Sequence, residues 1–216
     1  MHGRIPWHER TTLTPEQRAV YDEIVAGPRA GGPFQLTGPA GRLEGPFNAM
    51  LTAPGVGGPL QRLGAAIRYA TSLPDRSREI AILEVAAVRR CDFEWYAHER
   101  VGRGVGLTGE ELAALSTGAD AVTFDETERT LRAVCRALLT DRSLDDALYA
   151  RATADLGEHM LYELVVLVGY YDTLVLSLSA FRTPLPAGEP PVFDRPSPEP
   201  SPEQDPTTGR GAPPRL

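Results

Sequence analysis

The sequence predicts an all-α protein. Apolar residues recur at intervals of three and four through most of the chain, which is the spacing of one helix face. Several of these segments begin at a capping residue and end at Gly or Pro. Alternating β-branched residues joined by hairpin turns, which indicate strands, do not occur. We therefore expect a bundle of helices without a sheet.

The first half of the chain contains clear helix start and stop signals. Thr14, Pro15 and Gln17 make a capping box with proline at the first helical position, and Gly27 stops that helix. The Gly- and Pro-rich residues that follow should form a long loop up to about residue 46. The helices expected here lie at about 15–26, 46–54, 58–72 and 75–89. The last of these is apolar on most sides and should therefore be central.

The second half shows the same signals. Thr108 and Glu111 make another capping box, Ser143 and Asp146 resemble one, and Gly157 is suited to end a helix. The helices expected here lie at about 91–103, 109–116, 124–140, 143–156 and 160–181.

Residues 160–181 are the most apolar stretch, and they are long enough to span a membrane. Glu163 and Asp172 lie within it, and each would cost roughly 2.5 to 3.5 kcal/mol at the centre of a bilayer. We therefore expect no membrane span, but a helix buried in the core or at a subunit interface.

The composition changes at the end of the chain. Of the 20 prolines, 11 fall in the last 34 residues, in a polar stretch that cannot bury a core. We predict a helical domain at 1–186 and a disordered proline-rich tail at 187–216.

Charge and composition exclude several classes of protein. The net charge is −7, with no basic face to offset it, so no nucleic-acid partner is expected. All basic side chains other than histidine are arginines, and the lack of lysine excludes Schiff-base and P-loop chemistry. The first residues have no apolar signal region, so we expect a cytoplasmic protein. The two cysteines form no CxxC pair, so we expect no structural zinc site.

Residues 77–106 contain the candidate site. Three and four positions separate Cys91, Glu94 and His98, so on one helix these side chains and Trp95 would share a stripe. Glu79 lies in the preceding helix, 12 residues before Cys91. A thiol, a carboxyl and an imidazole on one stripe can supply nucleophilic and general acid/base chemistry.

Two readings without such chemistry compete with this one. The carboxyls and the imidazole can form a buried polar network that specifies packing, and Cys135 lies in an apolar run where it should be a core or subunit contact. Glu79, Glu94, His98 and Glu99 could bind a divalent ion, but their spacing matches no dedicated metal motif, so we expect no metal.

The sequence resembles the carboxymuconolactone decarboxylase family, which includes alkylhydroperoxidase D. The resemblance covers about residues 14–186 and rests on LTPEQRAVYDEI, GPFNAMLTAP, LVGYYDTLVLSLSAFRTPLP and above all on REIAILEVAAVRRCDFEWYAH. It implies a helical domain that assembles into homo-oligomers, commonly trimers or hexamers, with its site often near a subunit boundary.

The resemblance implies two chemistries. In alkylhydroperoxidase D a Glu, a CxxC and a His reduce peroxides; Glu79, Cys91 and His98 match that pattern, but Glu94 replaces the second cysteine. A one-cysteine peroxidase with an external reductant therefore stays open.

The decarboxylase branch needs no cofactor and acts on small lactone acids. Here His98 with Glu94 and Glu79 would be the acid/base group, and Phe47, Trp95 and Tyr96 would be apolar walls. We expect this second chemistry, on a small lactone or keto-acid-like molecule, with the peroxidase and a non-catalytic oligomeric binding protein as the alternatives.

Overall fold

The computed structural model describes residues 1–31 and 36–193, and most of them lie in helices. The helices are α1 (Pro15–Ala26), α2 (Pro46–Thr52), α3 (Pro54–Tyr69), α4 (Asp75–Val88), α5 (Asp92–Gly104), α6 (Gly109–Thr117), α7 (Glu126–Thr140) and α8 (Asp146–Phe181). Two short 3-10 turns, η1 (Arg10–Thr12) and η2 (Pro39–Gly41), complete them. In the described parts of the chain the only β-type pairings are isolated bridges, so the predicted all-α class is confirmed.

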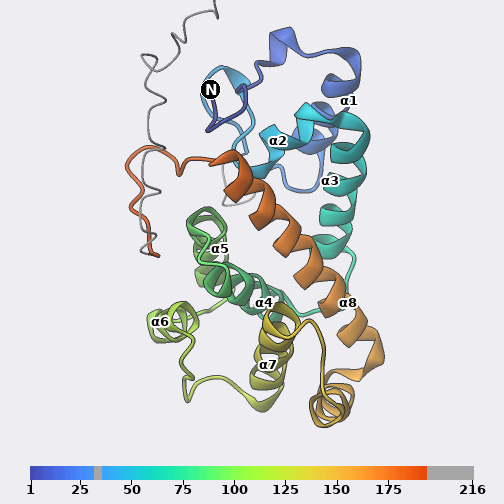
Figure 1. Cartoon of the computed structure of the whole chain (residues 1–216), viewed down its shortest axis with the longest axis vertical. Helices are drawn as coiled ribbons and strands as arrows, with labels where there is room; N and C mark the ends of the chain where they lie inside the picture. The colour runs from blue at the N-terminus through green and yellow to red at the C-terminus, as the bar shows by residue number, and fades with distance from the viewer. Residues whose placement is uncertain (32–35, 194–216) are drawn as a thin grey trace, which may run out of the picture.

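Helix α4 lies at the centre of the bundle. Its residues 77–86 are all buried, and the helix contacts α5, α6, α7 and α8. Helix α8 runs diagonally through the molecule (Figure 1) and packs on α7, α4, α2 and α3. Helices α3, α5 and α8 approach one another near the middle of the molecule (Figure 1).

The predicted capping boxes are present. Thr14 with Gln17 and Thr108 with Glu111 each exchange the two hydrogen bonds that close the first turn. Helix α8, however, is capped by Asp145 and not by Ser143. Gly157 has φ 77° and ψ 158°, which breaks α8 into two helical segments at the predicted position.

Two helix starts differ from the prediction. Helix α3 begins at Pro54, four residues early, because its glycines allow a close approach to α2: a Cβ at Gly57 would lie 2.0 Å from the Met50 carbonyl oxygen. Helix α5 begins after Cys91, which is the N-cap with an extended backbone. The preceding Arg90 has φ 51°, so the chain turns there, and Cys91 lies at the boundary between this turn and the helix.

The first residues of the chain lie against the end of α8. The Arg4 backbone N–H donates to the Phe181 carbonyl at 2.7 Å, and its guanidinium donates to the Ala180 carbonyl at 3.1 Å. Figure 1 shows the N-terminus close to this end of α8.

Residues 187–193, the start of the predicted tail, lie against α5. The backbone N–H groups of Val192 and Phe193 both donate to Asp92 Oδ1 at 2.8 Å. The buried Phe193 ring meets Trp95 edge to face, with 5.4 Å between ring centroids. Residues 194–216 lie outside the described residues, so the disorder predicted for them stays a prediction.

One helix in the described residues, α8, is long and apolar enough to cross a membrane by length and composition. Half of its most apolar stretch is buried inside the protein. Its other side carries exposed apolar residues, including Tyr162 and Leu176.

Candidate active site

A partly open cavity lies between α2, α3, α5 and α8. Its volume is about 90 Å³, which is enough for a small organic molecule. Seven apolar residues form much of its wall: Leu36, Pro46, Phe47, Phe93, Ala97, Val101 and Leu174. The polar and tyrosine side chains in the wall are Arg29, Arg68, Tyr69, Glu94, His98, Tyr170 and Tyr171.

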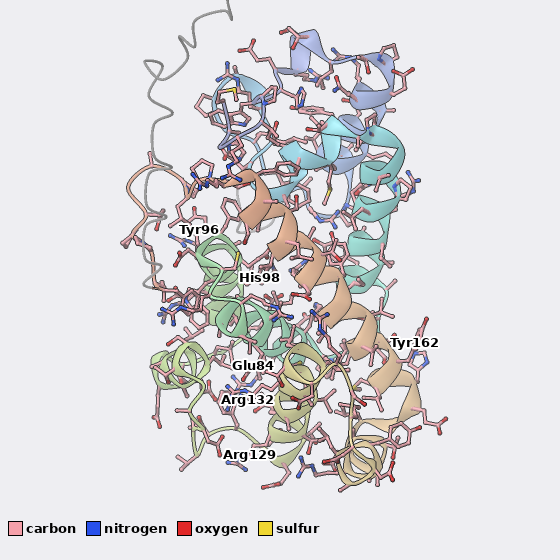
Figure 2. The ribbon with its side chains drawn as sticks, in the orientation of Figure 1. Glu84, Tyr96, His98, Arg129, Arg132 and Tyr162 are labelled. Carbon is pink, nitrogen blue, oxygen red and sulfur yellow. The ribbon has the colours of Figure 1, made fainter. Side chains whose placement is uncertain are left out.

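His98 is held by two elements. It lies on α5, on the side toward α8 (Figure 2), and its Nδ1 is 2.7 Å from Oε2 of Glu79 on α4. Arg68 on α3 donates to the other Glu79 oxygen at 3.1 Å. The Tyr171 ring stands edge-on to the His98 ring, with 5.2 Å between centroids. The imidazole is therefore fixed in orientation, and its Nε2 is the nitrogen left for other partners.

Glu94 is the second acidic group at the cavity. It lies one turn before His98 on α5, and its Oε2 is 3.6 Å from His98 Nε2. The side chain is almost fully buried, and its Oε1 has no hydrogen-bond partner among the described residues. A buried carboxyl oxygen without a partner costs free energy unless a ligand, water or proton occupies it.

The two carboxyls have pKa values shifted in opposite directions. Burial alone would raise the pKa of Glu79, but the charge and hydrogen bond of His98 and the charges of Arg68 and Arg78 together lower it. Burial raises the pKa of Glu94 to about 7, although His98 and Arg68 oppose that rise. At neutral pH Glu79 is therefore ionised, whereas a large fraction of Glu94 carries a proton.

Two adjacent tyrosines of α8 continue the wall. The rings of Tyr170 and Tyr171 meet edge to face at 5.2 Å, and Arg68 contacts the Tyr171 hydroxyl at 3.4 Å. Burial raises the pKa of Tyr170 to about 12 and raises that of Tyr171 further. Both phenols therefore stay protonated and can donate hydrogen bonds at neutral pH.

Of the predicted apolar walls, one lines the cavity and two do not. Phe47 lines it as expected. Trp95 instead packs on Phe193, and its Nε1 donates to Glu99 at 3.2 Å. Tyr96 lies on the outer side of α5 (Figure 2) under the Arg100 guanidinium, 4.0 Å from the ring centroid. Tyr96 is two positions from both Glu94 and His98, so the helix turns it away from their face. Trp95 is three positions from His98, but its ring is held by Phe193 instead.

Cys91 was predicted to share a stripe with Glu94 and His98, but it does not line the cavity that they line. Cys91 precedes the helix, and it lines a different cavity with Asp92, Phe93 and Arg182 among others. Seven positions separate it from His98, or about 10 Å along a helix axis. Cys135 is fully buried in the core, where burial raises the pKa of its thiol well above the ordinary value. Neither cysteine is in a disulfide.

Several residues of the cavity were not predicted from the sequence. Arg29, Arg68, Tyr170 and Tyr171 come from a loop and from helices other than α5, so no local spacing relates them to His98. A signal was present in Tyr170 and Tyr171, because hydroxyl groups inside the most apolar stretch of the chain need polar partners.

No group of three or more His, Cys, Asp or Glu side chains in residues 1–31 and 36–193 is arranged to hold a metal ion. Glu99, one of the ligands considered above, pairs with Arg103 at 2.7 Å.

Residues 54–137 match the model of the carboxymuconolactone decarboxylase family. The matched segment includes Arg68, Glu79, Glu94 and His98, whereas Arg29, Phe47 and both cavity tyrosines lie outside it. No curated protein matches the sequence.

Several solved structures share the fold. A peroxidase-related protein from Ralstonia eutropha JMP134 with an alkylhydroperoxidase AhpD core has a TM-score of 0.69 at 11% identity, over 85% of this chain and 92% of that one. A peroxidase-related protein from Silicibacter sp. TM1040 has a TM-score of 0.66 at 10% identity, over 84% and 91%. The debrominase Bmp8 in complex with 2,3,4-tribromopyrrole has a TM-score of 0.66 at 13% identity, over 87% and 92%. At these identities the likeness is one of fold.

Proposed function

We propose that this protein is an enzyme that uses acid/base chemistry. The premise is that residues 54–137 are a carboxymuconolactone decarboxylase family segment in an alkylhydroperoxidase-like fold. The enzyme needs no cofactor for this chemistry. The reaction is a proton transfer or a decarboxylation on a small lactone or keto-acid-like molecule.

The observation that carries the proposal is the unequal pair of carboxyls on either side of His98. Ionised Glu79 accepts from the imidazole Nδ1, so in the neutral ring Nε2 has the free lone pair and acts as a base. Glu94, whose pKa burial raises to about 7, supplies an acid close to that nitrogen. Environments that push two titratable groups apart in pKa are typical of acid/base sites.

The groups suggest how the reaction proceeds. In a proton transfer, His98 Nε2 takes a proton from carbon next to a carbonyl, and the electron pair moves into that carbonyl. Glu94 then returns a proton at the carbon that becomes saturated. In a decarboxylation, the C–C bond breaks, CO2 leaves, and the electron pair moves into the conjugated carbonyl before the same protonation. The apolar wall keeps water away from the intermediate.

The test is the loss of turnover in His98→Ala. We expect a reduction of at least 100-fold in the exchange of keto-acid or lactone C–H for deuterium, followed by NMR in D2O, because general acid/base groups contribute about 10²–10⁴. Helical content by circular dichroism should stay the same. His159→Ala is the matched control, because His159 is exposed on α8 and does not line the cavity. Retained exchange in His98→Ala would rule out this role.

The peroxidase alternative is weaker, although fold relatives are peroxidase-related. Cys91 lines another cavity, so the proposed relay from Glu79 and His98 does not reach it directly. Consumption of a hydroperoxide with a dithiol reductant, present in wild type and lost in Cys91→Ser but not in Cys135→Ser, would favour the peroxidase.

A purely structural polar network is the remaining alternative. It would leave these side chains closed to ligands, whereas Glu94 and His98 line the cavity. That access supports an enzyme over a packing role.

A further inference from the structure

Arg29 is a buried cation without an anionic partner in the described residues. Its side chain lines the same cavity as His98, and the residue is only 8% exposed. Its guanidinium donates to the side-chain and backbone oxygens of Gln61, both at 3.2 Å, and neither oxygen carries a charge. The other arginine of the cavity, Arg68, is half-buried and is paired with Glu79. An unpaired buried charge is costly, so its persistence needs an explanation.

The surroundings of Arg29 hold the guanidinium in place. It lies over the Phe47 ring, 5.4 Å from the centroid, which leaves the edge of its plane to hydrogen-bond partners. Gly64 on α3 makes room for it: a Cβ there would lie 2.0 Å from the Tyr170 hydroxyl and 2.7 Å from Arg29 Nη2. Phe47 on α2, Tyr170 on α8 and Gly64 on α3 thus all lie against the Arg29 guanidinium.

We propose that Arg29 and Tyr170 form a carboxylate subsite of this cavity, which binds a substrate carboxylate that does not react. The inference rests on the proposed function for the identity of the reacting end. A planar guanidinium and a phenol O–H together offer the parallel donors that a carboxylate accepts. The wall that contains Phe47, Phe93 and the tyrosines suits a flat, unsaturated carbon skeleton.

The subsite also orients the substrate. The Tyr170 and Tyr171 rings lie between Arg29 and His98, each in edge-to-face contact with the next aromatic group. A carboxylate bound at Arg29 is therefore kept away from His98 and Glu94, and its ion pair stabilises it against loss as CO2. The reacting carbon is at the opposite end of the skeleton from this carboxylate, so Arg29 is a positioning residue.

The test uses benzoate and benzamide, which share a shape and differ in charge, titrated calorimetrically into the full chain. We expect wild type to bind benzoate at least tenfold more tightly than benzamide. Arg29→Met should weaken benzoate binding at least tenfold and leave benzamide unchanged. Arg29→Lys should fall between the two, because lysine keeps the charge but not the planar fork.

Arg62→Met is the matched control, since Arg62 is exposed, pairs with Glu23 and does not line the cavity. Circular dichroism checks that each variant is folded, and Arg29→Lys alone suffices if Arg29→Met does not fold. Equal affinity for the two probes in wild type, no benzoate binding at all, or benzoate binding that survives substitution of Arg29 would overturn the proposal. Both probes bind without turnover, so a failure of the subsite is distinguishable from a failure of the proposed reaction, which the exchange assay tests separately.

Discussion

The environment of Glu94 favours the protonated, neutral form of its carboxyl group. It is 3% exposed, one of its oxygens has no partner in the described residues, and Glu79 adds a nearby negative charge. Only the charges of His98 and Arg68 favour ionisation, and they do not offset burial. The carboxyl therefore titrates near pH 7, in the range where a group can both give and take a proton.

This shift makes a prediction about stability. The pKa of Glu94 in the folded protein, about 7, lies above the ordinary value of 4.5, so folding favours the protonated form. The cost of the buried charge is absent below pH 4.5 and is fully present above pH 7, where it amounts to about 3 kcal/mol. We expect Glu94→Gln to match wild type in unfolding free energy near pH 4.5 and to become more stable than wild type as pH rises to 8.

Urea unfolding across this pH range measures the difference. Glu99→Gln is the control on the same helix, because it removes a more exposed pair with Arg103 and should change stability by less than about 1 kcal/mol at any pH. A gap between wild type and Glu94→Gln that does not vary between pH 4.5 and 8 would mean that Glu94 is ionised throughout.

The sequence predicted those site residues that a single helix relates. Glu94 and His98 are one turn apart on α5, and local spacing is sufficient to bring them together. Glu79 was assigned through the family resemblance, and its contact with His98 is tertiary. Arg29 and Tyr170 could not be predicted, because their approach depends on how the loop after α1 and α8 both pack on α3 at Gly64.

Helices α4 and α7 are joined by a buried ion-pair network. Glu84 on α4 is fully buried and accepts from Arg132 at 2.5 Å and from Arg136 at 2.9 Å, both on α7. Arg132 also lies over the Phe124 ring, 4.4 Å from its centroid. Figure 2 shows Glu84 and Arg132 facing each other between the two helices, with Arg129 farther along α7.

Removing the shared carboxylate should therefore be costly. We expect Glu84→Ala to lower the unfolding free energy by about 3–5 kcal/mol, because it removes the buried carboxylate that both arginines share and leaves Arg132 with only the exposed Asp120 as an anionic partner. Arg129→Ala, which removes only partly exposed pairs with Glu126 and Asp120, should cost less than about 1 kcal/mol. Chemical denaturation compares the two, and similar losses would show that the buried network contributes no more than a surface pair.

Element boundaries were predictable where a cap or a breaker acts locally. Gly157 and the capping boxes at Thr14 and Thr108 are such signals, and the structure has them. The starts of α3 and α5 were not, because one depends on glycine packing against α2 and the other on the turn at Arg90. Cys91 is thus the N-cap of α5, and it lines a different cavity from His98.

At the scale of the whole molecule, α8 carries an unpartnered apolar face. Among the residues on its outer side, 162, 166, 169, 173, 176 and 180 follow one another at intervals of four and three, and all of them are exposed except the half-buried Val166. That 3.5-residue spacing is the seam of helices that pack together in coiled coils. Tyr162 and Leu176 on this seam are 71% and 66% exposed. We propose that a second copy of the chain covers this face in the homo-oligomer that the sequence predicts.

A charge on the seam should then disrupt assembly. We expect the Tyr162→Glu and Leu176→Glu double variant to have a lower mass by light scattering than wild type, because a carboxylate cannot be buried in an apolar seam without a partner. Val122→Glu, at an exposed residue before α7, should keep the wild-type mass. A monomeric wild type, or an unchanged mass in the double variant, would contradict the proposed interface.

The hydrogen bonds from Arg4 to the end of α8 have a topological consequence. They bring the first residues of the chain beside the C-terminal end of α8, so the two ends of the helical part of the chain are close in space. A short linker could therefore join these two segments, and the chain could be opened at another surface turn without moving a helix. The exposed turn at 141–144, between α7 and α8, is a suitable place for new ends, and a circular permutant opened there would retain every element that lines the cavity.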